Sequence, residues 1–213
     1  MQGKRILFVG DSIALALRDP ADEKGLRGWA KRVCAAYGMD GVNAALGGAA
    51  FNCYSRTPRF GKEAMIANQI KVHAGEHFDY VLLHGGLNDA WDGVPFGEIT
   101  ASFDPSTFDP TTLCGAMETA FAAAVEQFGP EVKLGWIINF NSPEHTATTN
   151  ADIYYEQGKK VCQKWGIPYL DLFSIPYDIG ALNDDLLHPL AAGYDHLAPF
   201  IIDFILKMKR PDL

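Results

Sequence analysis

The segment that decides the fold is Arg5-Ile6-Leu7-Phe8-Val9-Gly10-Asp11-Ser12. The run from Arg5 to Val9 has no polar alternation, which predicts a short strand buried on both faces, as in a parallel sheet covered by helices. Gly10 ends this run and permits a tight exit from the strand. We therefore expect Ser12 just beyond the carboxyl end of the first strand.

The same arrangement of a short apolar run followed by glycine or a polar loop recurs along the chain. Further strands are predicted at residues 41–46, 80–84, 132–138 and 167–170. Helical spacing predicts helices at 28–37, 60–74, 111–128 and 151–165, and a C-terminal helix that ends near Lys209. Residues 92–110, which contain three prolines, and the polar residues 139–150 are expected to be loops.

Five strands that alternate with helices predict an α/β fold, in one domain that spans residues 1–213. The expected architecture is a three-layer α/β/α sandwich with a five-stranded parallel sheet. Ligands of such sheets bind outside the carboxyl ends of the strands. Chemically active side chains should therefore follow the strands and not precede them.

Composition limits the class of partner. The 213 residues include 18 lysines and arginines against 26 aspartates and glutamates, a formal net charge of −8. This balance disfavours nucleic acids and anionic membranes, because both select basic surfaces. The N-terminal sequence lacks the long apolar stretch of a signal peptide, and no segment is long enough to cross a membrane. We expect a cytoplasmic protein, and the sequence leaves open whether it forms a homo-oligomer.

Neither cysteines nor histidines form a metal-binding pattern. The four cysteines are Cys34, Cys53, Cys114 and Cys162. No pair has the close spacing of a zinc or redox motif, so we expect them to be reduced and mostly buried. His73 and His77 are four residues apart, but Gly75 lies between them and no third ligand is near. A solvated helix end is the favoured interpretation, and no metal is expected.

Three candidate groups each follow one of the first three predicted strands: Ser12, the pair Gly47-Gly48, and Asn88. A glycine N–H can approach a substrate oxygen closely, and an asparagine side chain can donate a hydrogen bond to a developing oxyanion. Taken singly, Ser12 and Asn88 are also typical of helix caps and turns. Only their common placement favours a catalytic interpretation.

A fourth candidate is Asp185-Leu186-Leu187-His188-Pro189, in the loop after the last predicted strand. An offset of three residues can bring a carboxylate against its own histidine. That carboxylate would fix the imidazole tautomer and stabilise the imidazolium that forms when the histidine takes a proton from serine. Asp184 lies four residues from His188 and fits this spacing less well.

Together these features resemble the GDSL or SGNH hydrolase family. The matching positions are Ser12 in Gly10-Asp11-Ser12, Gly48, Asn88 in Gly86-Leu87-Asn88-Asp89, and His188 with Asp185. The resemblance extends from residue 5 to about residue 200 and implies a flavodoxin-like SGNH hydrolase fold. The chain departs from the family pattern at Ile13, where leucine is usual, and at Asn43-Ala44-Ala45, where Asn-x-Gly is usual. Gly47 therefore stays an alternative to Gly48 as the oxyanion donor.

The resemblance implies a serine hydrolase that needs no cofactor. His188 would deprotonate Ser12, and Ser12 would attack an ester carbonyl to give an acyl-enzyme. The N–H groups of Ser12 and Gly48 and the side chain of Asn88 would hold the oxyanion. The expected substrate is a small-molecule ester, with an acetylated carbohydrate as the first choice. The alternatives are a lipase, lysophospholipase or thioesterase for longer acyl chains and, in a different class, a non-catalytic carbohydrate-binding module.

Four further residues are predicted to contact the substrate: Asp11, His84, Trp91 and His145. His84 ends a predicted strand, where a packed histidine is an equally good interpretation. Trp91 would form a wall for a sugar ring or an acyl group, with an anchor for the following loop as its alternative. His145 lies in the loop expected after the fourth strand.

Overall fold

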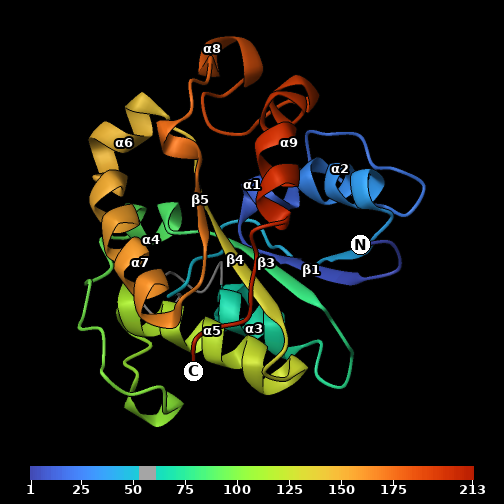
Figure 1. Ribbon diagram of the computed structural model, residues 1–213. Helices are drawn as coiled ribbons and strands as arrows, with labels where there is room; N and C mark the ends of the chain where they lie inside the picture. Colours follow the sequence, from blue (N-terminus) through green and yellow to red (C-terminus); the bar gives the residue numbers. More distant parts are fainter. Residues whose placement is uncertain (53–60) are drawn as a thin grey trace.

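A single parallel sheet in the order β2-β1-β3-β4-β5 forms the centre of the protein (Figure 1). The computed structural model describes residues 1–52 and 61–213, without the side chain of Glu144. The strands are β1 (Arg5–Val9), β2 (Asp40–Asn43), β3 (Tyr80–His84), β4 (Lys133–Ile138) and β5 (Tyr169–Asp171). In this register Leu7 of β1 lies opposite both Val42 and Val81. The first and third strands have the predicted bounds.

Helices cover both faces of the sheet, and successive residues of β4 point to opposite faces. The main helices are α2 (Gly28–Tyr37), α3 (Ile66–Lys71), α5 (Leu113–Phe128), α7 (Ala151–Trp165) and α9 (Ala191–Ile205). Gly135 leaves room for the Phe204 ring of α9, whereas the next residue, Trp136, packs on Gly158 of α7. Figure 1 shows α2 and α9 on one side and α3, α5 and α7 on the other. The predicted three-layer α/β/α architecture with five parallel strands is confirmed.

The other three predicted strands have different ends, and the strand predicted at 132–138 differs only in that it begins at Lys133. The strand predicted at 41–46 leaves the sheet at Asn43, because this side chain accepts a hydrogen bond from the Ala45 N–H (3.1 Å) and donates one to the Ala14 carbonyl (2.9 Å). The strand predicted at 167–170 begins only at Tyr169. Pro168, just before it, has no N–H to contribute to a ladder.

The helix predicted at 60–74 is shorter and is interrupted. Phe60 lies outside the described residues, and a 3-10 turn, η1 (Lys62–Ala64), precedes α3. Met65 between them is extended and forms a parallel bridge with Ala50, while the Ile66 N–H bonds to the Ala50 carbonyl (3.1 Å). This contact with the preceding loop prevents one continuous helix.

Five short elements outside the segments 60–74 and 92–110 were not predicted in the described part of the chain, and one of them replaces an expected loop. They are α1 (Ser12–Leu15), α4 (Leu87–Trp91), α6 (Pro143–Thr149), α8 (Ile179–Leu182) and the 3-10 turn η3 (Leu172–Ser174). The expectation of a loop at 139–150 was wrong, because Pro143 occupies the first turn of α6 and Asn150 ends it in the left-handed conformation. The C-terminal helix ends at Ile205 and runs through Pro199, whose side chain is exposed.

The segment 92–110 is mostly irregular, with one 3-10 turn, η2 (Pro105–Thr107), and it is fastened to the helices beneath it. Glu118 of α5 is fully buried, and it pairs with Lys164 of α7 and accepts a hydrogen bond from the Trp165 indole (3.2 Å). Lys164 also donates to Thr100 (3.2 Å) and to the carbonyl of Ser102. A buried ion pair therefore joins this segment to α5 and α7.

Three cysteines match the expectation, because Cys34, Cys114 and Cys162 are free and buried. Burial raises the pKa of the Cys114 thiol to about 11. Cys53 lies outside the described residues. Within the described part of the chain, no helix combines the length and apolar character that a membrane span requires.

Because Lys164 pairs with the buried Glu118, we predict that substitution of Lys164 destabilises the protein more than substitution of another lysine of α7. Lys164→Met should lower the free energy of unfolding by about 3 kcal/mol, because it leaves the Glu118 carboxylate buried without its cation. Lys160→Met on the same helix is the matched control, since Lys160 is exposed and bonds only to Gln157 among the described contacts. Urea denaturation measures both. Equal losses in the two variants would contradict the structural role of the pair.

Candidate active site

The site begins at Gly10, where the chain leaves β1. A Cβ atom at this position would lie 2.5 Å from the backbone oxygen of His84, so only glycine fits between the ends of β1 and β3. The Gln69 side chain of α3 accepts from the Gly10 N–H (2.8 Å) and donates to its carbonyl (2.9 Å). The residue two positions before Ser12 is thus held on both of its backbone polar groups.

Ser12 is the first residue of α1, a helix of four residues that other elements hold in place. Asp11 caps this helix by accepting from the Ile13 N–H (2.9 Å). The Tyr194 hydroxyl of α9 donates to the Ile13 carbonyl (2.6 Å), and Asn43 donates to the carbonyl of Ala14. Side chains from β2 and α9 therefore fix the backbone that carries Ser12.

Asp11 and His84 are a buried pair next to Ser12 in the fold. Their exposed fractions are 1% and 2%, and Nδ1 of His84 lies 3.0 Å from Oδ1 of Asp11. The His84 ring packs edge-on against Trp29 of α2, with 4.8 Å between ring centroids. The expectation that these two side chains contact the substrate stays a prediction: both are buried, and Nε2 of His84 has no hydrogen-bond partner among the described residues. They support the cap of α1.

His188 faces Ser12 across the edge of the sheet. Its Nε2 lies 2.8 Å from Ser12 Oγ, and its Nδ1 lies 2.7 Å from Asp185 Oδ2. Burial pushes the pKa of Asp185 upward, but hydrogen bonds from the His188 N–H, the His188 ring and the Leu187 N–H outweigh it and hold this pKa at about 2. The structure thus brings the three predicted residues into one hydrogen-bonded line, with the carboxylate ionised at neutral pH.

The loop that carries His188 is held from α6. Leu186 adopts a φ of 58°, which is rare for a residue with a branched side chain. Its carbonyl accepts a hydrogen bond from the Ser142 hydroxyl (2.8 Å), and the same hydroxyl lies 2.9 Å from Nδ1 of His145. This contact fixes the turn between Asp185 and His188.

Two of the predicted oxyanion residues, Gly48 and Asn88, lie in a turn and a short helix that are bonded to each other. Residues 46–49 form a turn closed by the Ala49 N–H and the Leu46 carbonyl (3.1 Å), and Gly48 has the positive φ of 74° in it. Asn88, on α4, donates from Nδ2 to the Ala49 carbonyl (2.8 Å). Gly47 precedes Gly48 in the same turn. Asn88 and the glycine turn are therefore neighbours at the carboxyl ends of β2 and β3.

A buried carboxylate clamps the same loop. Asp89 is fully buried and accepts hydrogen bonds from the N–H groups of Phe51 (3.0 Å) and Asn52 (2.9 Å). Because Asp89 follows Asn88 on α4, one short helix both bonds the turn at Ala49 and holds the residues after it. This makes the position of the glycine turn depend on α4.

Trp91 and His145 pack against each other on the surface. Their ring centroids are 5.5 Å apart at an angle of 39°, and Trp91 is 58% exposed. Trp91 lies three residues after Asn88, on the same side of α4. His145 lies on α6 and, through Ser142, next to the loop of His188. Both are thus placed beside the candidate site, as an aromatic pair between α4 and α6.

A pocket of about 210 Å³ opens beside Ser12 and His188. Its lining residues are Ser12, Leu17, Arg18, His188, Pro189 and Tyr194. Most of its wall is apolar, and Arg18 supplies a positive charge at the rim. The arrangement offers a hydroxyl, a base and a small apolar hollow next to both.

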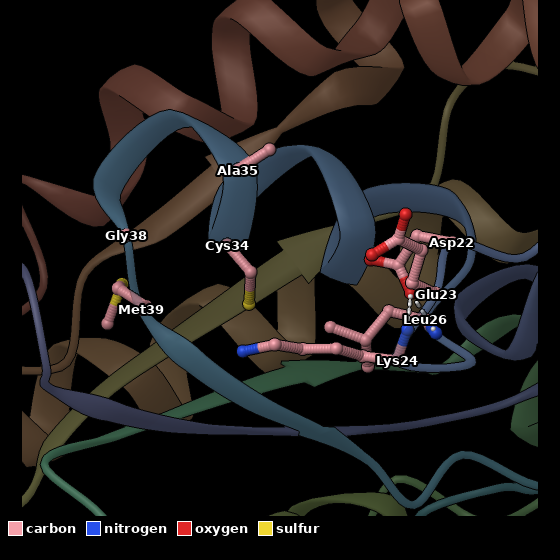
Figure 2. Close-up of a pocket in the computed structure, with 8 residues that line it drawn as sticks. All are labelled: Asp22, Glu23, Lys24, Leu26, Cys34, Ala35, Gly38 and Met39. Atoms are coloured by element: carbon pink, nitrogen blue, oxygen red, sulfur yellow. Dashed lines mark hydrogen bonds between the residues drawn. The ribbon is translucent and has the colours of Figure 1, made fainter.

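A larger hollow of about 410 Å³ lies under the loop before α2, next to Cys34 and Met39 (Figure 2). Figure 2 shows the Asp22 carboxylate turned back to bond the backbone of its own loop. Burial raises the pKa of Cys34 to about 12, so its thiol is not a nucleophile at neutral pH. Among the described residues that line this hollow, no nucleophilic side chain lies next to a basic one. The pocket beside Ser12 is therefore the candidate active site.

Sequence reasoning missed several residues that build this site. Gln69 and Asp89 carried a weak signal, since each is a polar residue within a largely buried stretch. Ser142 and Arg18 carried none, because each acts on residues far away along the chain. Tyr194 lies in Ala191-Ala192-Gly193-Tyr194, which resembles the last block of the family, but its contact with Ile13 could not be inferred from that.

The family match and the similar solved structures agree with each other. Residues 8–196 match the GDSL-like lipase/acylhydrolase family. A comparison with curated protein sequences gives no match. Among solved structures, a GDSL-like lipase from Bacteroides ovatus is similar over 97% of this chain and 100% of its own, with 17% identity and a TM-score of 0.69. An acetylxylan esterase from Geobacillus stearothermophilus is similar over 96% of this chain and 94% of its own, with 18% identity and a TM-score of 0.60. At these identities the likeness is one of fold.

The ionised state of Asp185 predicts a pH-dependent contribution to stability. Because its pKa falls from an ordinary 3.8 to about 2 on folding, its bonds stabilise the folded state above pH 3.8, and this stabilisation is lost as the pH falls toward 2. Unfolding by urea at a series of pH values, for the wild type and Asp185→Asn, measures it. The wild type should be the more stable protein at pH 5, with a gap that narrows below pH 4. A gap of constant size would contradict the lowered pKa.

Proposed function

This chain belongs to the GDSL-like lipase/acylhydrolase family and is a carboxylic ester hydrolase, and we propose that Ser12, His188 and Asp185 are its catalytic triad. The observation that carries this proposal is the 2.8 Å contact between Ser12 Oγ and His188 Nε2. With Nδ1–H donating to Asp185, Nε2 is the acceptor and is ready to take the serine proton.

In the first half of the proposed reaction, His188 takes the proton of Ser12 while Oγ attacks the ester carbonyl carbon. The carbonyl oxygen becomes an oxyanion, which the N–H groups of Ser12 and Gly48 and the Asn88 amide stabilise. Losing one such donor typically costs about a hundredfold to a thousandfold in rate. The bond from Asn88 to Ala49 keeps the amide in a fixed plane before substrate arrives.

In the second half, the proton on His188 passes to the departing alcohol oxygen as the C–O bond breaks, which leaves an acyl group on Ser12. His188 then takes a proton from water, the hydroxide attacks the acyl carbon, and the proton returns to Ser12 as the acid departs. His188 carries each proton, so the cycle balances without a metal or an organic cofactor.

The substrate that we favour is a carbohydrate carrying a short acyl group such as acetate. The pocket of about 210 Å³ equals the liquid volume of about seven water molecules. A short acyl group fits within this volume. The exposed ring of Trp91, backed by His145, offers a flat surface on which a sugar ring can stack. The fold of the acetylxylan esterase, an enzyme named for an acylated sugar polymer, is similar.

The second candidate is a lipase or thioesterase for longer chains. Leu17 at the rim of the pocket is exposed, which would extend an apolar path outward from Ser12. A non-catalytic carbohydrate-binding module has less support, because a binding module needs no hydrogen bond between a serine and a histidine.

Substitution of the triad tests the proposal. Ser12→Ala and His188→Ala should each lower kcat for nitrophenyl acetate by at least about a thousandfold, since nucleophile and base act as a unit. Ser174→Ala and His77→Ala are the matched controls, because both side chains lie outside the site and should retain full activity. A Ser12→Ala variant with wild-type activity would disprove the assignment.

Chain length separates the two substrate classes. Nitrophenyl acetate should have a kcat/KM at least about tenfold higher than nitrophenyl octanoate, because the pocket beside Ser12 is small. Steady-state rates with esters of two, four, six and eight carbons measure this preference. A kcat/KM that rises with chain length would favour the lipase or thioesterase.

A further inference from the structure

Among the described residues that line the pocket beside Ser12, Arg18 is the one cation. It follows α1 and reaches across to the loop of His188, where it contacts both Asp184 and Asp185. Its Nη2 lies 2.9 Å from Oδ2 of Asp185. The same oxygen lies 2.7 Å from Nδ1 of His188, so the guanidinium and the imidazole both contact one carboxylate oxygen.

The other contacts of Asp185 are local. Its Oδ1 accepts from the N–H groups of Leu187 (3.0 Å) and His188 (2.7 Å), both in the same loop. Among the described contacts of this carboxylate, the one from a distant part of the chain is that of Arg18, which is attached to the helix of Ser12. The Arg18 contact therefore joins the segment of the nucleophile to the segment of the base.

We infer that Arg18 is a positioning residue of the triad, which anchors Asp185 relative to Ser12 and offsets the negative charge that His188 experiences. This inference rests on the proposed function. The two carboxylates of the loop contribute a charge of −2, and Arg18 reduces it to −1. Removing this positive charge would leave two carboxylates beside the imidazole with no cation to offset them, and nearby negative charge favours the protonated form of an imidazole.

The remaining charged groups near the loop have partners of their own. Titratable side chains on the adjoining elements include Asp11, Asp19, His145, Tyr177, Asp178, Tyr194, Asp195 and His196. Asp195 pairs with Arg32, and Nε2 of His196 lies 3.1 Å from the Pro176 carbonyl oxygen. Asp11 contacts His84, Asp19 is held by Arg32 and Lys31, and His145 bonds to Ser142. Tyr177 donates to Asn183 (2.5 Å), Tyr194 to Ile13, and Asp178 caps α8. Among these elements Arg18 is the cation in direct contact with Asp185.

The test compares Arg18→Met with Arg210→Met. Arg210 forms an exposed ion pair with Glu131, so its substitution removes the same charge at a distance from the site. In Arg18→Met the acid limb of kcat/KM for nitrophenyl acetate should move to higher pH by about 0.5 to 1 unit, a modest shift because the pair is partly exposed. Arg210→Met should leave the limb in place. The midpoint of the His188 ring titration, followed by NMR, should move with the limb.

Two further variants test the direction in which the acid limb of kcat/KM moves. Asp184→Asn removes a carboxylate and leaves Arg18 to Asp185, so the acid limb should move to lower pH. Arg18→Lys keeps the charge but not the planar guanidinium, so the limb should stay near that of the wild type while kcat falls about twofold to fivefold. If Arg18→Met does not fold, this pair of variants decides the question.

An Arg18→Met protein with an unshifted acid limb and an unshifted NMR midpoint would overturn the inference. So would an Asp184→Asn limb that moves to higher pH. Failure of the proposed function shows differently, as a Ser12→Ala variant that still hydrolyses the ester. The NMR midpoint reports on Arg18 without any turnover, so the two failures are distinguishable.

Discussion

The hydrogen bond between Ser12 and His188 is the contact that the surrounding structure holds in place. It joins residues 176 positions apart in the chain, across the carboxyl edge of the sheet. Neither partner lies on an element that is stable alone, since α1 has four residues and His188 follows a loop with a left-handed Leu186. Because neither element is stable alone, contacts with neighbouring elements are needed to hold the serine and the histidine 2.8 Å apart.

That support comes from side chains that convert loops into fixed structure. Gln69 and Asp11 hold the exit from β1, and Ser142 holds the loop before His188. Asp89 and Asn88 hold the glycine turn after β2. Each bond satisfies a backbone group that a loop would otherwise leave to water, so the edge of the sheet presents its polar groups in one arrangement before a substrate binds.

Continuous apolar segments were the readable part of the sequence. β1 and β3 have their predicted bounds because a strand buried on both faces leaves an unbroken apolar run, and α7 has the bounds expected from its spacing. The polar composition of 139–150 concealed α6, whose start signal is Pro143. The depth of Asp11 and His84 could not be read from sequence, since a strand end is buried or exposed according to what packs on it. Arg18 gave no local sign, because its partner is Asp185.

Covalent labelling of Ser12 is the most direct test of the proposed active site. A fluorophosphonate probe reacts with a serine only where a base removes its proton and donors receive the developing charge. We predict that intact protein takes up one probe, that peptide mass spectrometry places it on Ser12, and that His188→Ala slows the labelling by at least about a hundredfold. A folded protein that stays unlabelled, or that carries the probe on a different serine, would contradict the account.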